Sequence, residues 1–175
     1  DPASLATFNP RDANGLVDHA SVAVESPYLV AISGLARDPT RREGDPRVHC
    51  FNAETGQSLW SLDIASLDPS LAEAWARGPA VISQGVVTVC AVKYSQQRRL
   101  TTVQLVGLDA ATGKLLWRRP LASAGILPFG RPTEASDLPT LHEGAIYRVE
   151  RIGVISSVDA ATGRVLWARR AVSQP

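Results

Sequence analysis

The sequence predicts an all-β protein built from about three repeated, four-stranded antiparallel sheets. Two observations lead to this prediction. Short apolar runs rich in β-branched residues alternate with turn residues along most of the chain. A ten-residue motif also returns at residues 51–60, 108–117 and 158–167. Self-similarity at intervals of 57 and 50 residues is typical of proteins that stack one small structural unit on the next.

Each copy of the motif reads Asp/Asn-Ala-x-Thr-Gly-x-x-Leu-Trp, which predicts a tight turn followed by a strand. Asp or Asn accepts hydrogen bonds from backbone N–H groups two or three residues on, and Thr adds a second local bond. Glycine adopts a positive φ without steric cost. The positions concerned are Asn52, Asp109 and Asp159, then Thr55, Thr112 and Thr162, then Gly56, Gly113 and Gly163.

The motif ends in a tryptophan, and Trp60, Trp117 and Trp167 occupy this position while Trp75 does not. Burying a side chain of this size removes roughly 150–250 Å² from water. At about 25 cal/mol per Å² this is worth at most on the order of 4–6 kcal/mol. We therefore expect each ring to join neighbouring sheets, with stacking on a ligand as the alternative.

The motif resembles the tryptophan-docking motif of the pyrroloquinoline-quinone (PQQ)-like β-propeller repeat family. The resemblance covers most of residues 20–172, and Cys50, Gly107 and Ser157 fall at the family's small-residue position. It implies an incomplete propeller of about three blades, in which each tryptophan packs between its own small residue and the glycine turn of the next blade. The family includes quinoprotein alcohol dehydrogenases, a lipoprotein of outer-membrane β-barrel assembly, and sensor propellers.

We expect a lead-in segment at residues 1–19 and a propeller segment at 20–175, with blades at about 20–65, 79–121 and 138–172. The first blade begins with a run in which apolar and polar residues alternate, and a second, more apolar run follows. A charged loop at 37–47 and the first motif follow. Its expected strands are 20–25, 28–33, 48–53 and 57–63.

Residues 66–78 break the strand pattern and predict a short helix between blades. Asp68-Pro69 is typical of a helix start, and Leu71 and Trp75 are spaced to share one face.

The second and third blades repeat the pattern of the first. Residues 86–92 are the most β-prone run and suit a strand buried on both faces. A Gly/Pro-rich connection at 122–138 contains an apolar stretch at 127–129, which fits either packing or a contact patch. The expected strands are 80–83, 86–94, 100–109 and 114–121, then 139–142, 145–149, 154–159 and 164–170.

Composition excludes several classes of protein. The chain has 18 basic and 17 acidic residues, so it shows no electrostatic footprint for nucleic acid. No apolar run reaches the length of a membrane span. Two cysteines, Cys50 and Cys90, lie far apart in apolar runs, which favours buried free thiols over a disulfide.

No catalytic, cofactor-binding or metal-binding motif stands out. His19, His49 and His142 lie in different segments without ligand spacing, and no phosphate loop or nucleophile elbow is present. Quinoprotein dehydrogenases carry adjacent cysteines above the quinone and Glu/Asn ligands to calcium. This sequence has no adjacent cysteine pair, which weighs against a PQQ enzyme.

Three blades fall short of the roughly four to eight that close a propeller. We therefore expect a protein partner, the remaining blades, or a second copy of the chain to cover the open faces. The predicted function is a non-catalytic interaction scaffold or assembly subunit without cofactor, and the fold analogy places it in the periplasm or elsewhere outside the cytoplasm. The alternatives are a fragment of a PQQ-dependent oxidoreductase and the sensor domain of a receptor or kinase.

Overall fold

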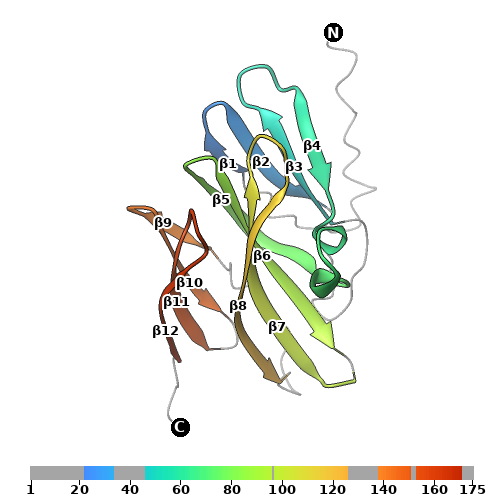
Figure 1. Ribbon diagram of the computed structural model, residues 1–175, viewed down its shortest axis with the longest axis vertical. Coiled ribbons are helices and arrows are strands. Elements are labelled where there is room, and N and C mark those ends of the chain that lie inside the picture. Colours follow the sequence, from blue (N-terminus) through green and yellow to red (C-terminus); the bar gives the residue numbers. More distant parts are fainter. Residues whose placement is uncertain (1–21, 34–45, 96, 126–137, 151–152, 171–175) are drawn as a thin grey trace, which may run out of the picture.

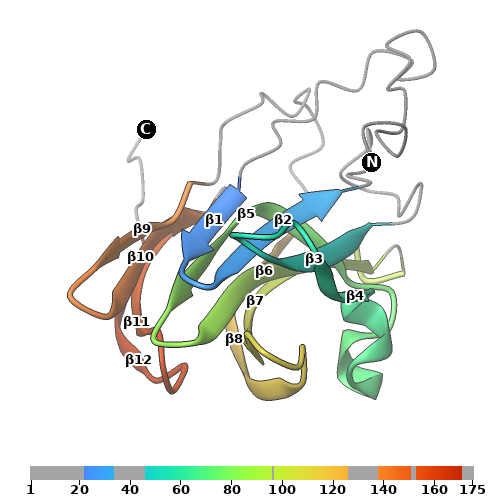
Figure 2. The same ribbon diagram turned by 90° about the horizontal axis from the view of Figure 1, so that it is seen from above.

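The structure, a computed structural model, consists of three four-stranded antiparallel sheets (Figure 1). It describes residues 22–33, 46–95, 97–125, 138–150 and 153–170. Each sheet is called a blade and numbered in chain order. The blades do not form a closed ring, and blade 2 lies between the other two (Figures 1 and 2). The predicted all-β fold with three four-stranded antiparallel sheets is confirmed.

Blade 1 has the strand order β1-β2-β3-β4. Its strands are β1 (Val22–Glu25), β2 (Tyr28–Ser33), β3 (Arg47–Asn52) and β4 (Ser58–Leu62). A bulge between Cys50 and Phe51 shifts the register of β4 just beyond the first motif turn, and Trp60 lies opposite Cys50.

Blade 2 has the order β5-β6-β7-β8 and the longest strands. They are β5 (Trp75–Ser83), β6 (Val86–Ser95), β7 (Leu100–Asp109) and β8 (Leu115–Gly125). The β5–β6 turn places Gln84 and Gly85 at positive φ, which matches the twist of a two-residue hairpin.

Blade 3 has the order β9-β10-β11-β12. Its strands are β9 (Thr140–His142), β10 (Ala145–Glu150), β11 (Val154–Asp159) and β12 (Val165–Arg170). Trp167 lies opposite Ser157, again just past a bulge.

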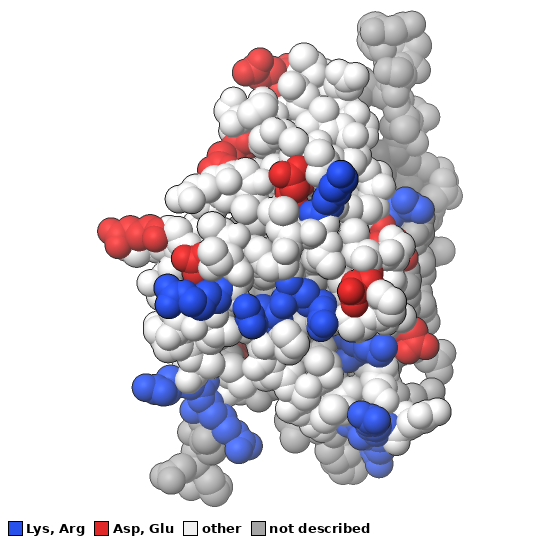
Figure 3. Space-filling view, viewed as in Figure 1, with Lys and Arg blue, Asp and Glu red and all other residues white. Residues whose placement is uncertain are grey.

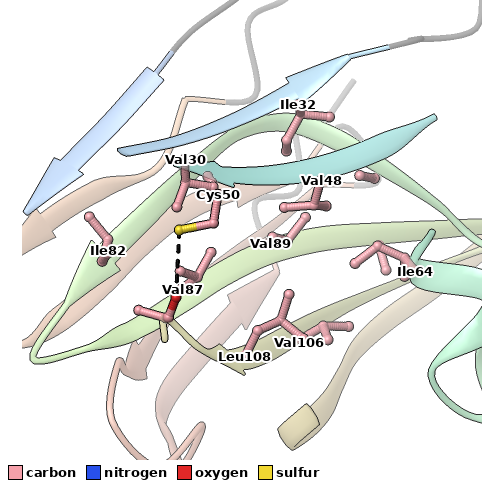
Figure 4. Packing of buried hydrophobic residues seen from close by; sticks show 14 of the residues in the cluster. Val30, Ile32, Val48, Cys50, Ile64, Ile82, Val87, Val89, Val106 and Leu108 are labelled. Carbon is pink, nitrogen blue, oxygen red and sulfur yellow. Dashed lines mark hydrogen bonds between the residues drawn. The ribbon is translucent and has the colours of Figure 1, made fainter. Parts of the chain in front are cut away.

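The larger core lies between blades 1 and 2. Val30, Val48 and Cys50 of blade 1 face Val87 and Leu108 of blade 2, and all five side chains are fully buried (Figure 4). Side chains alternate along each strand, so every second side chain enters this layer and the others point to the opposite face of the sheet.

The second core lies between blades 2 and 3. Val92, Val103 and Leu105 of blade 2 pack with Val158 of β11. Strand β6 therefore supplies both layers, which explains why residues 86–92 are buried without interruption, as the sequence predicts.

Basic side chains gather on two outer strands. Strands β8 and β12 are the last of their sheets, and they carry Arg118, Arg119, Arg169 and Arg170. Lys and Arg form a band over this part of the surface (Figure 3). Charged side chains on an edge strand hinder pairing with a strand of another molecule.

The predicted helix at 66–78 is wrong. Two short 3-10 turns occur instead, η2 (Ile64–Ser66) and η3 (Pro69–Leu71), and Trp75 already begins strand β5. Trp75 pairs with Val92 in β6, so cross-strand pairing outweighs the local helical spacing. Asp68 still behaves as a helix start, because its side chain accepts from the backbone N–H of Ser70.

The lead-in at 1–19, most of the charged loop at 37–47 and the apolar stretch at 127–129 lie outside the described residues. The predicted connection at 122–138 begins later than expected, because β8 continues to Gly125 opposite Leu100. In the part of the chain that the structure describes, no helix has the length and apolar character of a membrane span.

Candidate functional site: docking positions between blades

The three motif turns have the same hydrogen bonds. In each turn the glycine N–H donates to the carbonyl of the Asp or Asn four residues earlier, at 2.8–2.9 Å. The Oδ1 atom of the same Asp or Asn accepts from the Thr backbone N–H, also at 2.8–2.9 Å. The residues that form these turns are Asn52, Thr55 and Gly56, then Asp109, Thr112 and Gly113, then Asp159, Thr162 and Gly163.

The two aspartates are held in their charged form. The hydroxyls of Thr112 and Thr162 donate to Asp109 and Asp159 at 2.6 and 2.7 Å. These hydroxyls are the first cause, and nearby backbone N–H groups add to it, so that the pKa of each carboxyl lies below its ordinary value. Asn52 makes the equivalent backbone contacts without a charge.

Each turn is also tied to the first hairpin of its own blade. The N–H groups of Ala53, Ala110 and Ala160 donate to the carbonyls of Pro27, Gly85 and Gly144 at 2.7–2.9 Å. The turn that follows the third strand is thereby fixed relative to the turn that follows the first strand.

Trp60 of blade 1 reaches the motif turn of blade 2. Its Nε1 donates to the carbonyl of Ala110 at 2.8 Å. A β-carbon added at Gly113 would lie 2.9 Å from Cδ2 of this ring, so the glycine leaves the space that the indole occupies. The thiol of Cys50 donates to the same carbonyl at 3.5 Å, and blade 1 therefore contacts Ala110 twice.

Trp117 of blade 2 lies between two glycines. A β-carbon at Gly107 of its own blade would lie 2.6 Å from Cδ2, and one at Gly163 of blade 3 would lie 2.9 Å from Cζ3, with other ring atoms closer still. Unlike Trp60, its buried Nε1 has no hydrogen-bond partner within the described chain.

The contact with Gly163 is instead completed by Arg119, whose Nε donates to the Gly163 carbonyl at 2.8 Å. The sequence prediction missed Arg119, although its signal is present: an arginine follows the tryptophan by two positions in both the second and the third motif.

Trp167 and Gly56 differ from their counterparts. Trp167 is 40% exposed and contacts Tyr147 of its own blade, with ring centroids 6.2 Å apart. No described atom lies within 4 Å of a β-carbon built at Gly56. Trp60 and Trp117 are half-buried against the following blade, whereas the described residues contain no blade beyond Trp167, so a blade-joining role for Trp167 stays a prediction.

A second contact between blades also escaped sequence prediction. The carboxylate of Glu25 accepts from the backbone N–H groups of Gln84 and Gly85, both at 3.0 Å. Two adjacent N–H groups in a turn with positive φ form a concave site for an anionic oxygen. Glu25 thus joins the first hairpin of blade 1 to that of blade 2.

The remaining candidate side chains do not converge. Cys50 and Cys90 are buried free thiols, as predicted, and burial raises the pKa of Cys50. His49 hydrogen-bonds to Ser33 at 2.7 Å, and His142 lies 3.8 Å from Glu143, while His19 lies outside the described residues. Within the described ranges, no three His, Cys, Asp or Glu side chains are grouped to hold a metal ion.

Solved structures with the same fold include BamB and two dehydrogenases. BamB from Moraxella catarrhalis is 19% identical with a TM-score of 0.52, over 86% of this chain and 36% of that one. The quinohemoprotein alcohol dehydrogenase ADHIIG from Pseudomonas putida HK5 is 18% identical with a TM-score of 0.55, and the match covers 85% of this chain and 26% of that one. A europium-containing methanol dehydrogenase is 13% identical with a TM-score of 0.58, and the match covers 86% of this chain and 31% of that one.

The chain therefore spans about a third or less of the length of these β-propeller structures. No curated protein matches the sequence at a significant level. A family model described as "Outer membrane protein assembly factor BamB" matches residues 44–175, which is most of the chain and includes all three motifs. The chain belongs to this PQQ-like β-propeller repeat family.

Proposed function

We propose that this chain is a non-catalytic segment of a PQQ-like β-propeller, which acts as an interaction scaffold within a larger assembly. In this proposal the three motifs are docking elements. Their tryptophans, glycines and turn-forming Asp, Asn and Thr residues hold blades together and present further blade faces to partners. The scaffold lies outside the cytoplasm, as the name of the matching family suggests.

One observation carries this proposal: the motif side chains are used in contacts between blades. Trp60 and Trp117 lie against Gly113 and Gly163 of the following blade, and the aspartates are held by local hydrogen bonds within their turns. Residues of a reaction centre would instead point into a common space. The likeness to BamB, which is named as an assembly factor, supports the same role.

A PQQ-dependent oxidoreductase is the competing function. Three dehydrogenases share the fold with TM-scores of 0.52 to 0.58, beside the 0.52 of BamB, so the likeness in fold fits either function. A propeller of this kind could bind a quinone by residues on several blades, of which this chain would supply only some.

Addition of PQQ with calcium to the purified chain, and to the longest polypeptide that contains it, separates the two functions. We expect no quinone retained after gel filtration and no dye reduction with methanol or ethanol. Retained quinone absorbance or alcohol-dependent dye reduction would contradict the scaffold proposal.

Cross-linking in the native cell envelope provides the positive test. We expect a defined protein partner whose yield falls when Trp167 is replaced by alanine and is unchanged when the neighbouring Leu166 is replaced. Equal cross-linking of both variants would place the contact elsewhere and contradict a role for this blade face.

A further inference from the structure

The first hairpins of blades 2 and 3 have turns of nearly the same backbone conformation. Gln84 and Gly85, between β5 and β6, have φ of +53° and +73°. Glu143 and Gly144, between β9 and β10, have φ of +48° and +74°. Two successive residues with positive φ direct two adjacent backbone N–H groups to one side of a turn, where they form a site for an anionic oxygen.

The turn of blade 2 already binds a carboxylate. Glu25, the last residue of β1 in the preceding blade, accepts from Gln84 N–H through Oε1 and from Gly85 N–H through Oε2, both at 3.0 Å. A carboxylate that uses both oxygens in this way makes two charge-assisted hydrogen bonds, which are stronger than neutral ones and fix its orientation. The turn conformation is therefore suited to a carboxylate group.

The turn of blade 3 has no such partner in the part of the chain that the structure describes. Among these residues, no side chain accepts from the N–H groups of Glu143 and Gly144. Ser83, the last residue of β5, has the position in blade 2 that Glu25 has in blade 1. Its hydroxyl group has neither the charge nor the length of the Glu25 side chain.

Blades 2 and 3 are joined next to these turns in the same way as blades 1 and 2. Trp117 of blade 2 lies against the Gly163 turn of blade 3, as Trp60 of blade 1 lies against the Gly113 turn of blade 2. Each of these motif turns is bonded through an alanine N–H to the first hairpin turn of its own blade, at 2.9 Å in blade 2 and 2.8 Å in blade 3. The first hairpin turns of the three blades follow one another along one side of the molecule (Figure 1).

We propose that the β9–β10 turn is a second carboxylate-binding site, which takes the carboxylate of another molecule, carried by a small organic acid or by an acidic side chain of a protein. The two oxygens accept from the N–H groups of Glu143 and Gly144, beside Ser83. Both blades that form the site lie within the described chain, so it is the same whether or not further blades follow. The inference goes beyond the scaffold function and does not rest on it, because a propeller that bound quinone would have the same turn.

The charge beside the site differs between the two turns. Residue 84 is a neutral glutamine, whereas the side chain of Glu143 is 85% exposed and lies 3.8 Å from His142. Water screens an exposed like charge, so Glu143 weakens the binding of an anion only modestly. Glu143→Gln is therefore expected to raise the affinity for a carboxylate about twofold.

Acetate is the first probe, and the backbone amide resonances of the isotope-labelled chain report its binding. Acetate is titrated from millimolar to several hundred millimolar, with chloride keeping the ionic strength constant. The N–H signals of Glu143 and Gly144 are expected to shift downfield and to saturate. The signals of Gln84 and Gly85 are expected to stay unchanged, because these N–H groups already donate to Glu25.

Exchange of the residues that end the two first strands is the decisive measurement. Glu25→Ser gives blade 1 the residue that blade 2 has, so Gln84 and Gly85 are expected to become responsive to acetate. Ser83→Glu supplies a carboxylate from within the chain, so the response of the β9–β10 turn is expected to be lost at the same acetate concentrations. Ser83→Gln has the same length without the charge, and as the matched control it is expected to keep the response.

Two short peptides with blocked termini separate the sources of the carboxylate. One carries a single glutamate between glycines, and the other carries glutamine in its place. Tighter binding of the glutamate peptide than of acetate, at the same two amides, assigns the site to an acidic side chain of a protein. Binding no tighter than that of acetate assigns it to a small organic acid, and both outcomes support a carboxylate site.

Three outcomes would overturn the proposal. One is that the amides of Glu143 and Gly144 do not respond to acetate, or respond equally to chloride, and this result needs no variant. Another is unchanged acetate binding in a Ser83→Glu chain that circular dichroism shows to be folded. The third is that the glutamine peptide binds at this turn as tightly as the glutamate peptide.

Discussion

Trp117 shows how one residue joins two blades. Its ring occupies the space that a β-carbon would need at Gly107 and at Gly163, so it packs on backbone at both sides. Trp167 has the same place in the motif and is 40% exposed. The contribution of the motif tryptophan to the free energy of unfolding therefore depends on whether a following blade packs against it.

Replacement of Trp117 by alanine should destabilise the chain by about 3–5 kcal/mol, as for other large aromatics removed from a packed site. Trp167→Ala is the matched control and should cost less than about 1 kcal/mol when the chain is monomeric. Denaturant unfolding followed by circular dichroism gives both values. Equal losses for the two variants would contradict the difference in packing.

Because of Asp109 and Asp159, the free energy of unfolding depends on pH in the acidic range. Their pKa values are lowered in the folded chain, mainly by the hydroxyls of Thr112 and Thr162. The stability they contribute is therefore fully present above the ordinary carboxyl pKa and is lost as pH falls through the lowered value.

The double variant Asp109→Asn/Asp159→Asn should flatten this dependence, because Asn52 shows that an amide oxygen accepts the same backbone bonds. Free energies of unfolding between roughly pH 6 and pH 2 should fall less steeply for the variant than for the unmodified chain. Parallel curves would show that these carboxyls do not contribute.

At the scale of the element, the motif turn combines a backbone requirement with a space requirement. Gly56 and Gly163 have nearly the same φ, +70° and +68°, but only Gly163 has an indole against it. The pair therefore separates the cost of backbone conformation from the cost of crowding.

Gly56→Ala should cost about 1–2 kcal/mol, the usual penalty for a side chain in the left-handed region. Gly163→Ala should cost roughly 1–3 kcal/mol more, since the added methyl group displaces Trp117. Thermal and denaturant unfolding of the two variants test this order. A loss for Gly56→Ala as large as that for Gly163→Ala would contradict it.

The sequence predicts the turns well and the element between blades 1 and 2 poorly. The Asp/Asn-x-x-Thr-Gly pattern specifies local hydrogen bonds, and these form whatever the blade packs against. Residues 72–80 depend on distant partners instead. Trp75 joins β5 because Val92 of β6 lies opposite it, and the register break around Gly78 and Pro79 accommodates a proline within a strand.

For the whole molecule, blade 2 is the only described blade that is covered on both faces. Val87 and Leu108 pack toward blade 1, and Val92 and Leu105 pack toward blade 3. Blades 1 and 3 each have one face with large exposed apolar residues, such as Val24 and Val149. Local opening should therefore begin in the outer blades.

Native-state hydrogen exchange should show the slowest amides in β6 and β7 and the fastest in β9 and β12, when measured on monomeric chain. If the amides of β12 were protected as strongly as those of β6 under these conditions, the contribution of two-sided packing would be contradicted.

Contacts between blades were only partly predictable from the sequence. The resemblance to the PQQ-like repeat family implies that each tryptophan packs on its own small residue, and Cys50, Gly107 and Ser157 lie opposite Trp60, Trp117 and Trp167 in the sheets. Arg119 and Glu25 act across blades on backbone atoms of turns, and their partners are defined only by the way the sheets lie against each other.

The bond from Arg119 to Gly163 has a consequence for how such proteins lengthen. The second and third repeats each carry this arginine on the last strand and a glycine turn before it, whereas the first repeat has Leu62 at the arginine position. In-frame duplication of one whole second or third repeat would therefore add a contact between blades that has both its donor and its acceptor. Insertion of half a repeat would leave a donor or an acceptor without its counterpart. Growth by complete units is therefore the change in copy number that this architecture tolerates.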